Sequence, residues 1–152
     1  MFRAKTLLVA VDFSETSERA VDMALELAGR FDGKVVLLHA YEIPALGFPD
    51  GVLVASSEVV SRISSAAQAA LEKLVEQHKG RAPIETMLRT GVAYETINKV
   101  ADEVNADLVV IGTHGRRGIA RALLGSVAEN VIRTGTRPVL VVHGAREATA
   151  AA

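Results

Sequence analysis

The chain of 152 residues contains no cysteine and no tryptophan, and it carries no surplus of basic side chains. The absence of cysteine excludes a disulfide framework, an iron–sulfur cluster, a thiolate zinc site and a cysteine nucleophile. Its 17 basic and 18 acidic side chains give a net charge of −1, whereas generic nucleic-acid binding needs a basic surplus. With 4% aromatic residues, we also expect no platform for stacking single-stranded bases.

Long apolar runs are absent as well, since none approaches the length that crosses a membrane. Residues 1–5 lead directly into a short apolar segment, without the longer apolar stretch and cleavage site of a secretory leader. We therefore expect a soluble, cytoplasmic protein with no membrane partner. The length suits one domain, which we place at residues 1–144, and the small and polar residues 145–152 are expected to be a disordered tail.

Short apolar runs alternate with longer amphipathic segments along the chain. Four continuous runs, rich in β-branched residues, are typical of strands covered on both faces: 7–11, 35–38, 108–111 and 139–142. Segment 84–89 alternates polar and apolar residues, which indicates a half-solvated edge strand. Helical stripes are predicted on Ala20, Ala24, Leu27 and Phe31; on Ile63, Ala67, Ala70, Leu71 and Leu74; on Ile97, Val100, Ala101 and Val104; and on Val127, Ala128, Val131 and Ile132.

This alternation predicts an α/β fold, namely a doubly wound, five-stranded parallel sheet with four helices in a Rossmann-like three-layer sandwich. Ser14 or Ser17 is expected to cap the first helix. Residues 41–54 contain two prolines and two glycines, and we interpret them as a long loop of functional interest.

The residues after the fourth strand indicate a ligand. Ile111-Gly112-Thr113-His114-Gly115-Arg116 follows that strand, and Gly125-Ser126-Val127 opens the last helix. Glycines let backbone N–H groups approach an anion, and the first turn of a helix offers unpaired amides and a positive dipole end. Three arginines and no acidic residue lie between Gly115 and Gly125. We expect a phosphate here, although a tight turn and a helix start account for the same glycines.

Asp12 ends the first strand, beside the crevice where doubly wound sheets bind ligands. Its carboxylate suits ribose hydroxyls or a divalent cation; alternatively, Asp12 or Ser14 only caps the following helix. His39 and His114 are expected at nearby strand tips, but their spacing does not require a metal centre, and we expect none. No base or nucleophile for catalysis is recognisable, so we assign no catalytic residue.

The pattern Gly112-x2-Gly115-x9-Gly125-Ser126 resembles the nucleotide-binding signature of the universal stress protein family, G-x2-G-x9-G-[S/T]. Residues 8–12 with Ser14, 37–40 and 137–142 look like further landmarks of that family. The resemblance implies a fold of the adenine nucleotide alpha hydrolase type with strand order 3-2-1-4-5. It also implies ATP between strands 1 and 4, and a homodimer.

Carried over to this chain, the resemblance implies that Val11 and Asp12 contact adenine and ribose, and that Ala40 offers its backbone to the adenine edge. The residues of the signature would hold ribose and phosphates, with the Ser126 hydroxyl on a phosphate or on a phosphate-bound Mg²⁺. The implied binding residues are Val11, Asp12, Ser14, Ala40, Ile111, Gly112, His114, Gly115, Arg116, Gly125, Ser126 and Val127.

The last strand, Val139–Val142, is uniformly apolar although this strand order places it at a sheet edge. An exposed apolar edge invites pairing, and Glu85 and Arg89 guard the opposite edge. We expect this strand to pair with its copy across a two-fold axis. The alternative is that the C-terminal tail folds over the edge.

These observations favour an ATP-binding stress-response module, a homodimer with an unidentified protein partner and at most slow ATP hydrolysis. Two alternatives remain open. One is an enzyme that hydrolyses ATP or transfers an adenylate. The other is a nucleotide-free interaction protein in which the glycine loop is structural.

Overall fold

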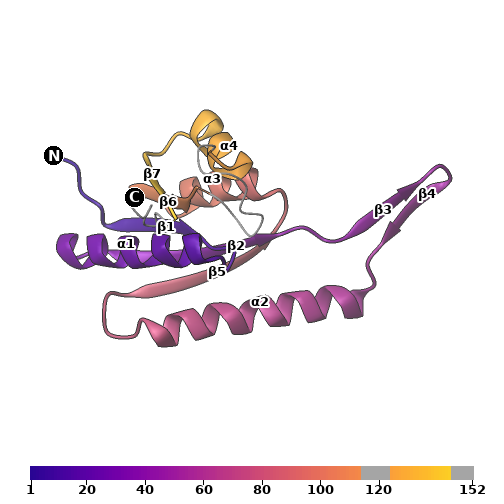
Figure 1. Ribbon diagram of the computed structural model, residues 1–152, viewed down its shortest axis with the longest axis horizontal. Helices are drawn as coiled ribbons and strands as arrows, with labels where there is room; N and C mark the ends of the chain where they lie inside the picture. The colour runs from indigo at the N-terminus through magenta and orange to yellow at the C-terminus, as the bar shows by residue number, and fades with distance from the viewer. Residues whose placement is uncertain (114–123, 145–152) are drawn as a thin grey trace, which may run out of the picture.

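A computed structural model describes residues 1–113 and 124–144. Five parallel strands form the main sheet in the order β5-β2-β1-β6-β7 (Figure 1). These strands are β1 (Thr6–Ala10), β2 (Lys34–Tyr41), β5 (Ile84–Thr90), β6 (Leu108–Gly112) and β7 (Val139–Val142). Numbered among themselves, they stand in the order 3-2-1-4-5, so the predicted fold class and strand order are confirmed.

Helices cover both faces of this sheet. One apolar cluster joins the sheet to α1 (Glu15–Phe31) and α2 (Ser57–Gln77). A second cluster joins the other face to α3 (Ala93–Glu103) and α4 (Ser126–Thr134). Leu7 and Val9 belong to the first cluster and Leu8 to the second, as the alternation of side chains along a strand requires. Burial on both faces explains why the central strands are continuous apolar runs.

None of the helices in the described residues is long and apolar enough to span a bilayer.

Two predicted apolar stripes are partly wrong. Phe31 at the end of α1 is 40% exposed, and in α4 Val127 and Ile132 are 37% and 47% exposed. The short helix α4 contacts the sheet through Ala128 and Val131, one turn apart, so its flanking apolar residues face outward. The buried stripe of α1 is shifted accordingly, to Ser17, Ala20, Val21, Ala24, Leu25 and Ala28.

The predicted loop 41–54 is also corrected by the structure. Tyr41 ends β2, and the residues beyond it form an antiparallel hairpin of β3 (Ala45–Phe48) and β4 (Gly51–Val54). The hairpin is a two-stranded sheet of its own that projects away from the main sheet (Figure 1). Prolines and glycines interrupt the pattern of this segment, but Pro49 lies in the turn between the strands, where it breaks no ladder.

Gly33 lies between α1 and β2, at the end of the sheet where β1 and β2 begin. A Cβ atom on Gly33 would lie 2.5 Å from the carbonyl oxygen of Ala4 and 2.9 Å from that of Lys5. The next residue, Lys34, donates its N–H to the same Lys5 oxygen at 2.8 Å, so the backbones are held together at this point. Only glycine fits this contact without moving the backbone.

We expect Gly33→Ala to lower the free energy of unfolding by about 1–3 kcal/mol, because the added methyl group overpacks rigid backbone. Gly29→Ala in α1 is the matched control, since the nearest atom its Cβ would meet is 4.0 Å away. This change should raise the stability by about 0.5–1 kcal/mol through helix propensity. Urea denaturation followed by circular dichroism measures both, and equal stability of the two variants would contradict the packing argument.

Candidate functional site

The centre of the sheet contains a topological switch point between β1 and β6. These strands are direct neighbours, with Val9 opposite Val110. From β1 the chain continues toward β2 on one side, whereas from β6 it continues toward β7 on the other. Open α/β sheets bind ligands at the carboxyl ends of the strands that flank such a point. The predicted site residues of β1, β2 and β6 lie at this edge of the sheet.

A tight turn follows β1. The Asp12 carboxylate accepts hydrogen bonds from the Ser14 N–H, at 3.0 Å, and from the Ser14 hydroxyl. Ser14 is the N-cap of α1, and its Oγ accepts from the N–H of Ser17 at 3.2 Å. Between them, Phe13 has a φ of 61°, a left-handed conformation that bulky side chains rarely adopt. Ser14 therefore caps α1, as one of the two predicted candidates, and Asp12 orients that cap.

The tip of β2 is fastened to the end of β1. Val11 donates its N–H to the Leu38 carbonyl at 2.8 Å, and its own carbonyl lies 2.6 Å from Nδ1 of His39. Because a carbonyl oxygen only accepts, Nδ1 carries the proton. The His39 ring also lies 4.7 Å from the ring of Phe13, centroid to centroid. Side chains alternate along a strand, so Ala40 faces the opposite side of the sheet, toward α3 and α4.

The end of β6 packs against the start of α1. Ile111 is buried, and a Cβ atom on Gly112 would lie 2.6 Å from the Cγ2 atom of Thr16. Gly112 therefore permits the close approach of α1, in addition to the ligand approach for which the sequence singled it out. This contact is long-range, and nothing in the local pattern reveals it.

Helix α4 begins directly beside the end of β6. The Gly125 N–H donates to the Thr113 carbonyl at 2.6 Å, and Gly125 is the N-cap residue of α4. Glycine has no side chain to cap the helix, and no side chain of the described residues does so. The first turn, with Ser126 and Val127 exposed, thus presents backbone amides and the positive dipole end at the switch point. His114, Gly115 and Arg116 lie outside the described residues.

Thr113 is a site residue that the sequence reasoning missed. It is 2% exposed, and its Oγ1 has no hydrogen-bond partner within residues 1–113 and 124–144. By alternation it lies on the same side as Ile111, the side of α3 and α4. A buried hydroxyl without a partner costs free energy and marks a place for a ligand oxygen or a water. In the sequence, its position next to Gly112 in the glycine segment is the feature that points to Thr113.

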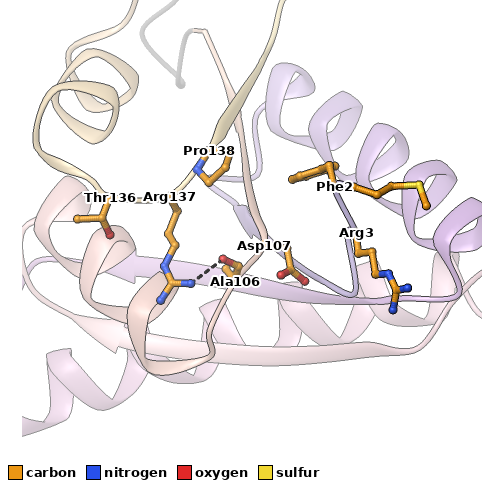
Figure 2. Close-up of a pocket in the computed structure, with 8 residues that line it drawn as sticks. Phe2, Arg3, Ala106, Asp107, Thr136, Arg137 and Pro138 are labelled. Atoms are coloured by element: carbon orange, nitrogen blue, oxygen red, sulfur yellow. Dashed lines mark hydrogen bonds between the residues drawn. The ribbon is translucent and has the colours of Figure 1, made fainter.

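A cavity of about 600 Å³ lies at the opposite edge of the sheet, at the amino ends of the strands (Figure 2). Its Arg137 donates to the Ala106 carbonyl at 3.1 Å and to the Asp102 carboxylate at 2.9 Å. The hydrogen bond from Arg137, aided by Thr136, lowers the pKa of Asp102 below its usual 3.8. Asp107 accepts from the N–H groups of residues 5 and 6, both at 2.9 Å. These polar groups tie the strand ends together, which is a structural role.

The described residues contain no group of three histidine, aspartate or glutamate side chains close enough to hold a metal ion. His39 contacts the Val11 carbonyl instead, and His114 lies outside the described residues.

Comparison with known proteins identifies relatives of the chain. Residues 3–143 match the pattern of the universal stress protein family. The chain is 34% identical over 140 residues to universal stress protein MJ0531 of Methanocaldococcus jannaschii, covering 91% of this chain and 81% of that protein.

Solved structures show the same fold. The structure of protein MJ0577, from the same archaeon, superimposes with a TM-score of 0.79 at 25% identity, covering 94% of this chain and 98% of that one. A universal stress protein in complex with cAMP matches with a TM-score of 0.68 at 31% identity over 93% and 98% of the two chains. A universal stress protein of Archaeoglobus fulgidus in complex with dAMP matches with a TM-score of 0.61 at 25% identity over 93% and 99%.

We expect Thr113→Val to raise the free energy of unfolding by about 1–3 kcal/mol, because it removes a buried hydroxyl that has no partner among the described residues. The control is Ser17→Ala. The Ser17 hydroxyl is also buried, but it donates to the Ser14 carbonyl at 3.0 Å. Its loss should lower the stability by about 0.5–1.5 kcal/mol. Denaturant titration of ligand-free protein measures both changes, and a destabilised Thr113→Val variant would show that the hydroxyl is paired.

Proposed function

We propose that this chain, which belongs to the universal stress protein family, binds ATP with Mg²⁺ at the switch point and acts as a nucleotide-responsive regulatory module. One observation carries the proposal: the uncapped first turn of α4 is held against the end of β6 by the hydrogen bond from Gly125 to Thr113. An anion-binding helix terminus thus lies at the edge of the sheet where α/β folds bind nucleotides.

The phosphates are assigned to the start of α4. Its free amides and dipole favour negative charge, and the exposed Ser126 hydroxyl lies in the same turn. In the sequence, Arg116 belongs to the glycine segment that leads to this helix and adds positive charge. Mg²⁺ binds mainly to phosphate oxygens and water, so it needs no cage of protein carboxylates. The Ser126 hydroxyl supplies one further oxygen ligand.

The nucleoside is assigned to the tips of β1 and β2. Asp12 offers carboxylate oxygen to ribose hydroxyls, the backbone at Val11 lies beside the nucleoside, and Ala40 offers its backbone to the edge of the base. The orphaned Thr113 hydroxyl donates one hydrogen bond to a ligand oxygen. The related proteins in complex with cAMP and dAMP support this assignment, because both of those ligands join adenine to a phosphate.

Rapid phosphoryl transfer requires a residue that positions the attacking group and takes its proton. Asp12 is the carboxylate of the site, and the Ser14 amide and hydroxyl both donate to it. These contacts engage the Asp12 carboxylate in the turn before α1, and its oxygens are assigned above to the ribose hydroxyls rather than to a water at the terminal phosphate. We therefore propose that nucleotide occupancy, rather than turnover, is the output, with hydrolysis slow at most.

The double variant Gly125→Val, Ser126→Val should reduce ATP affinity by about 10- to 100-fold. The valine side chains block the backbone amides at the start of α4, and the charge-assisted hydrogen bond from the Ser126 hydroxyl to a phosphate is lost. Gly125 has φ −62° and ψ 151°, which valine adopts readily, so the fold should persist. Isothermal titration with Mg-ATP measures the affinity.

The matched control is Ser57→Val, which makes the same change at the exposed first residue of α2 and should leave the affinity unchanged. Equal affinity in the double variant and the wild type would refute the phosphate assignment. Rapid release of ADP, or of AMP with pyrophosphate, by the wild type would instead favour an enzyme.

We further propose that β7 pairs with its copy to form a homodimer. The carbonyls of Pro138 and Val142 accept hydrogen bonds from β6, both at 2.9 Å. By alternation, the N–H and C=O groups of Val139 and Val141 point outward from the sheet edge. The strand carries no charge or bulge to block pairing. Two such edges related by a two-fold axis satisfy each other.

We expect Val141→Pro to separate the two copies that pair through β7 and so to halve the sedimenting mass, because it removes an outward N–H without breaking the ladder to β6. Thr86→Pro is the matched control and should keep the wild-type mass. The carbonyl of Pro83 and the N–H of Gly91 bond to β2, which places the Thr86 N–H on the outer side of the opposite edge. Sedimentation velocity measures the mass, and a Val141→Pro variant with the wild-type mass would exclude pairing through β7.

A further inference from the structure

The hairpin of β3 and β4 is the most apolar exposed feature of the described residues. Neither strand contains a charged residue. Five large apolar side chains on it are between 57% and 69% exposed: Leu46, Phe48, Val52, Leu53 and Val54. Exposed apolar side chains are ordinary when scattered, but a contiguous group of this kind marks an interaction site.

The hairpin has little to stabilise it in isolation. It forms a separate two-stranded sheet, closed at its base by a 3.0 Å hydrogen bond from the Ala55 N–H to the Pro44 carbonyl. A two-stranded hairpin is marginally stable at best in water. Leu46 is opposite Leu53, and Phe48 lies two residues along from Leu46, so these three side chains share one face. Covering that face would stabilise the hairpin.

A second surface with apolar lining lies between α1 and α2. It is a groove of about 490 Å³, and apart from Lys73 and Gln77 its lining on α2 is apolar: Ile63, Ala66, Ala67, Ala70 and Leu74. Phe13 and His39 line it from the strand tips, and Glu18 and Lys73 bring the charges. The alanines leave room for bulky side chains from outside. The groove lies on the α1–α2 face of the sheet, whereas the start of α4 belongs to the other face.

A chain cannot fill its own groove with its own hairpin. Only Ala55 and Ser56 separate β4 from α2, and the hairpin extends away from the helix (Figure 1). A second copy carries both surfaces and allows a reciprocal exchange about a two-fold axis. Burying a large apolar side chain removes roughly 60–120 Å² from water. The three docking side chains of each hairpin therefore remove about 180–360 Å². Two hairpins and an equal area of the two grooves give about 720–1,440 Å², which overlaps the lower part of the roughly 1,200–2,000 Å² of a stable interface.

We propose that the face of the hairpin formed by Leu46, Phe48 and Leu53 docks in the α1–α2 groove of a second copy of this chain, which returns its hairpin. The strands of the hairpin carry no charge, so they suit an apolar groove and offer no charged group to a nucleic acid or an acidic partner. This interface is separate from the β7 edge. With perpendicular two-fold axes, the two interfaces together close an assembly of four copies.

The test is sedimentation velocity of the full chain in a two-by-two design. The first set of changes is Leu46→Ser with Leu53→Ser, and the second is Val141→Pro. The wild type should sediment as four copies. Either set of changes alone should halve the mass, and both together should give one copy. If β7 pairing fails, the wild type should be a dimer that the hairpin changes alone dissociate.

Two further variants locate the contact. Val52→Ser with Val54→Ser makes equal changes on the opposite face of the hairpin and should leave the mass unchanged. Ala66→Glu puts a charge into the groove and should halve the mass, as the hairpin variant does. The proposal is overturned if Leu46→Ser with Leu53→Ser keeps the wild-type mass with and without Val141→Pro. It is equally overturned if only the Val52 and Val54 changes dissociate the assembly. A variant with Ala66→Glu that keeps the wild-type mass would also overturn it.

Discussion

The hydrogen bond from the Gly125 N–H to the Thr113 carbonyl, 2.6 Å long, is the contact on which the candidate site depends. It places the first turn of α4 directly beside the last residues of β6, so the partial positive charge of the helix lies at the sheet edge. The N–H of Thr113 donates in turn to Val142, which ties the same point to β7. Ligand binding at α4 and pairing at the β7 edge would therefore act on one short stretch of backbone.

Much of the fold was predictable because its information is local. A parallel sheet buried on both faces requires continuous apolar runs, and a solvated edge strand requires alternation, as residues 84–89 show. The Ser14 cap and the glycine start of α4 are local signals too. The sequence therefore predicted which residues stand at the switch point, including Asp12 and Gly112.

The features that the sequence did not predict depend on contacts between distant residues. Thr16 packs where a Cβ of Gly112 would lie, and no spacing within either segment reveals that contact. The burial of Thr113, whose hydroxyl has no partner among the described residues, is likewise a tertiary feature. The sequence predicts a loop at the hairpin because turn-forming residues interrupt a very short apolar pattern, and the two strands pair only with each other. The outward Val127 and Ile132 follow from the contact of α4 with the sheet through Ala128 and Val131.

Three features of the described residues are energetically incomplete: the buried Thr113 hydroxyl, which has no partner among them, an apolar strand edge and an apolar hairpin. They differ in what completes them. A hydroxyl needs one oxygen or nitrogen atom at fixed geometry, which a small ligand supplies. A strand edge needs another backbone, and an apolar face needs area rather than direction. The chemistry of each feature thus distinguishes the proposed ligand site from the two proposed protein interfaces. In this proposal, a change of occupancy at the first would reach the second through Thr113, whose carbonyl accepts from Gly125 at the start of α4 and whose N–H donates to Val142 of β7.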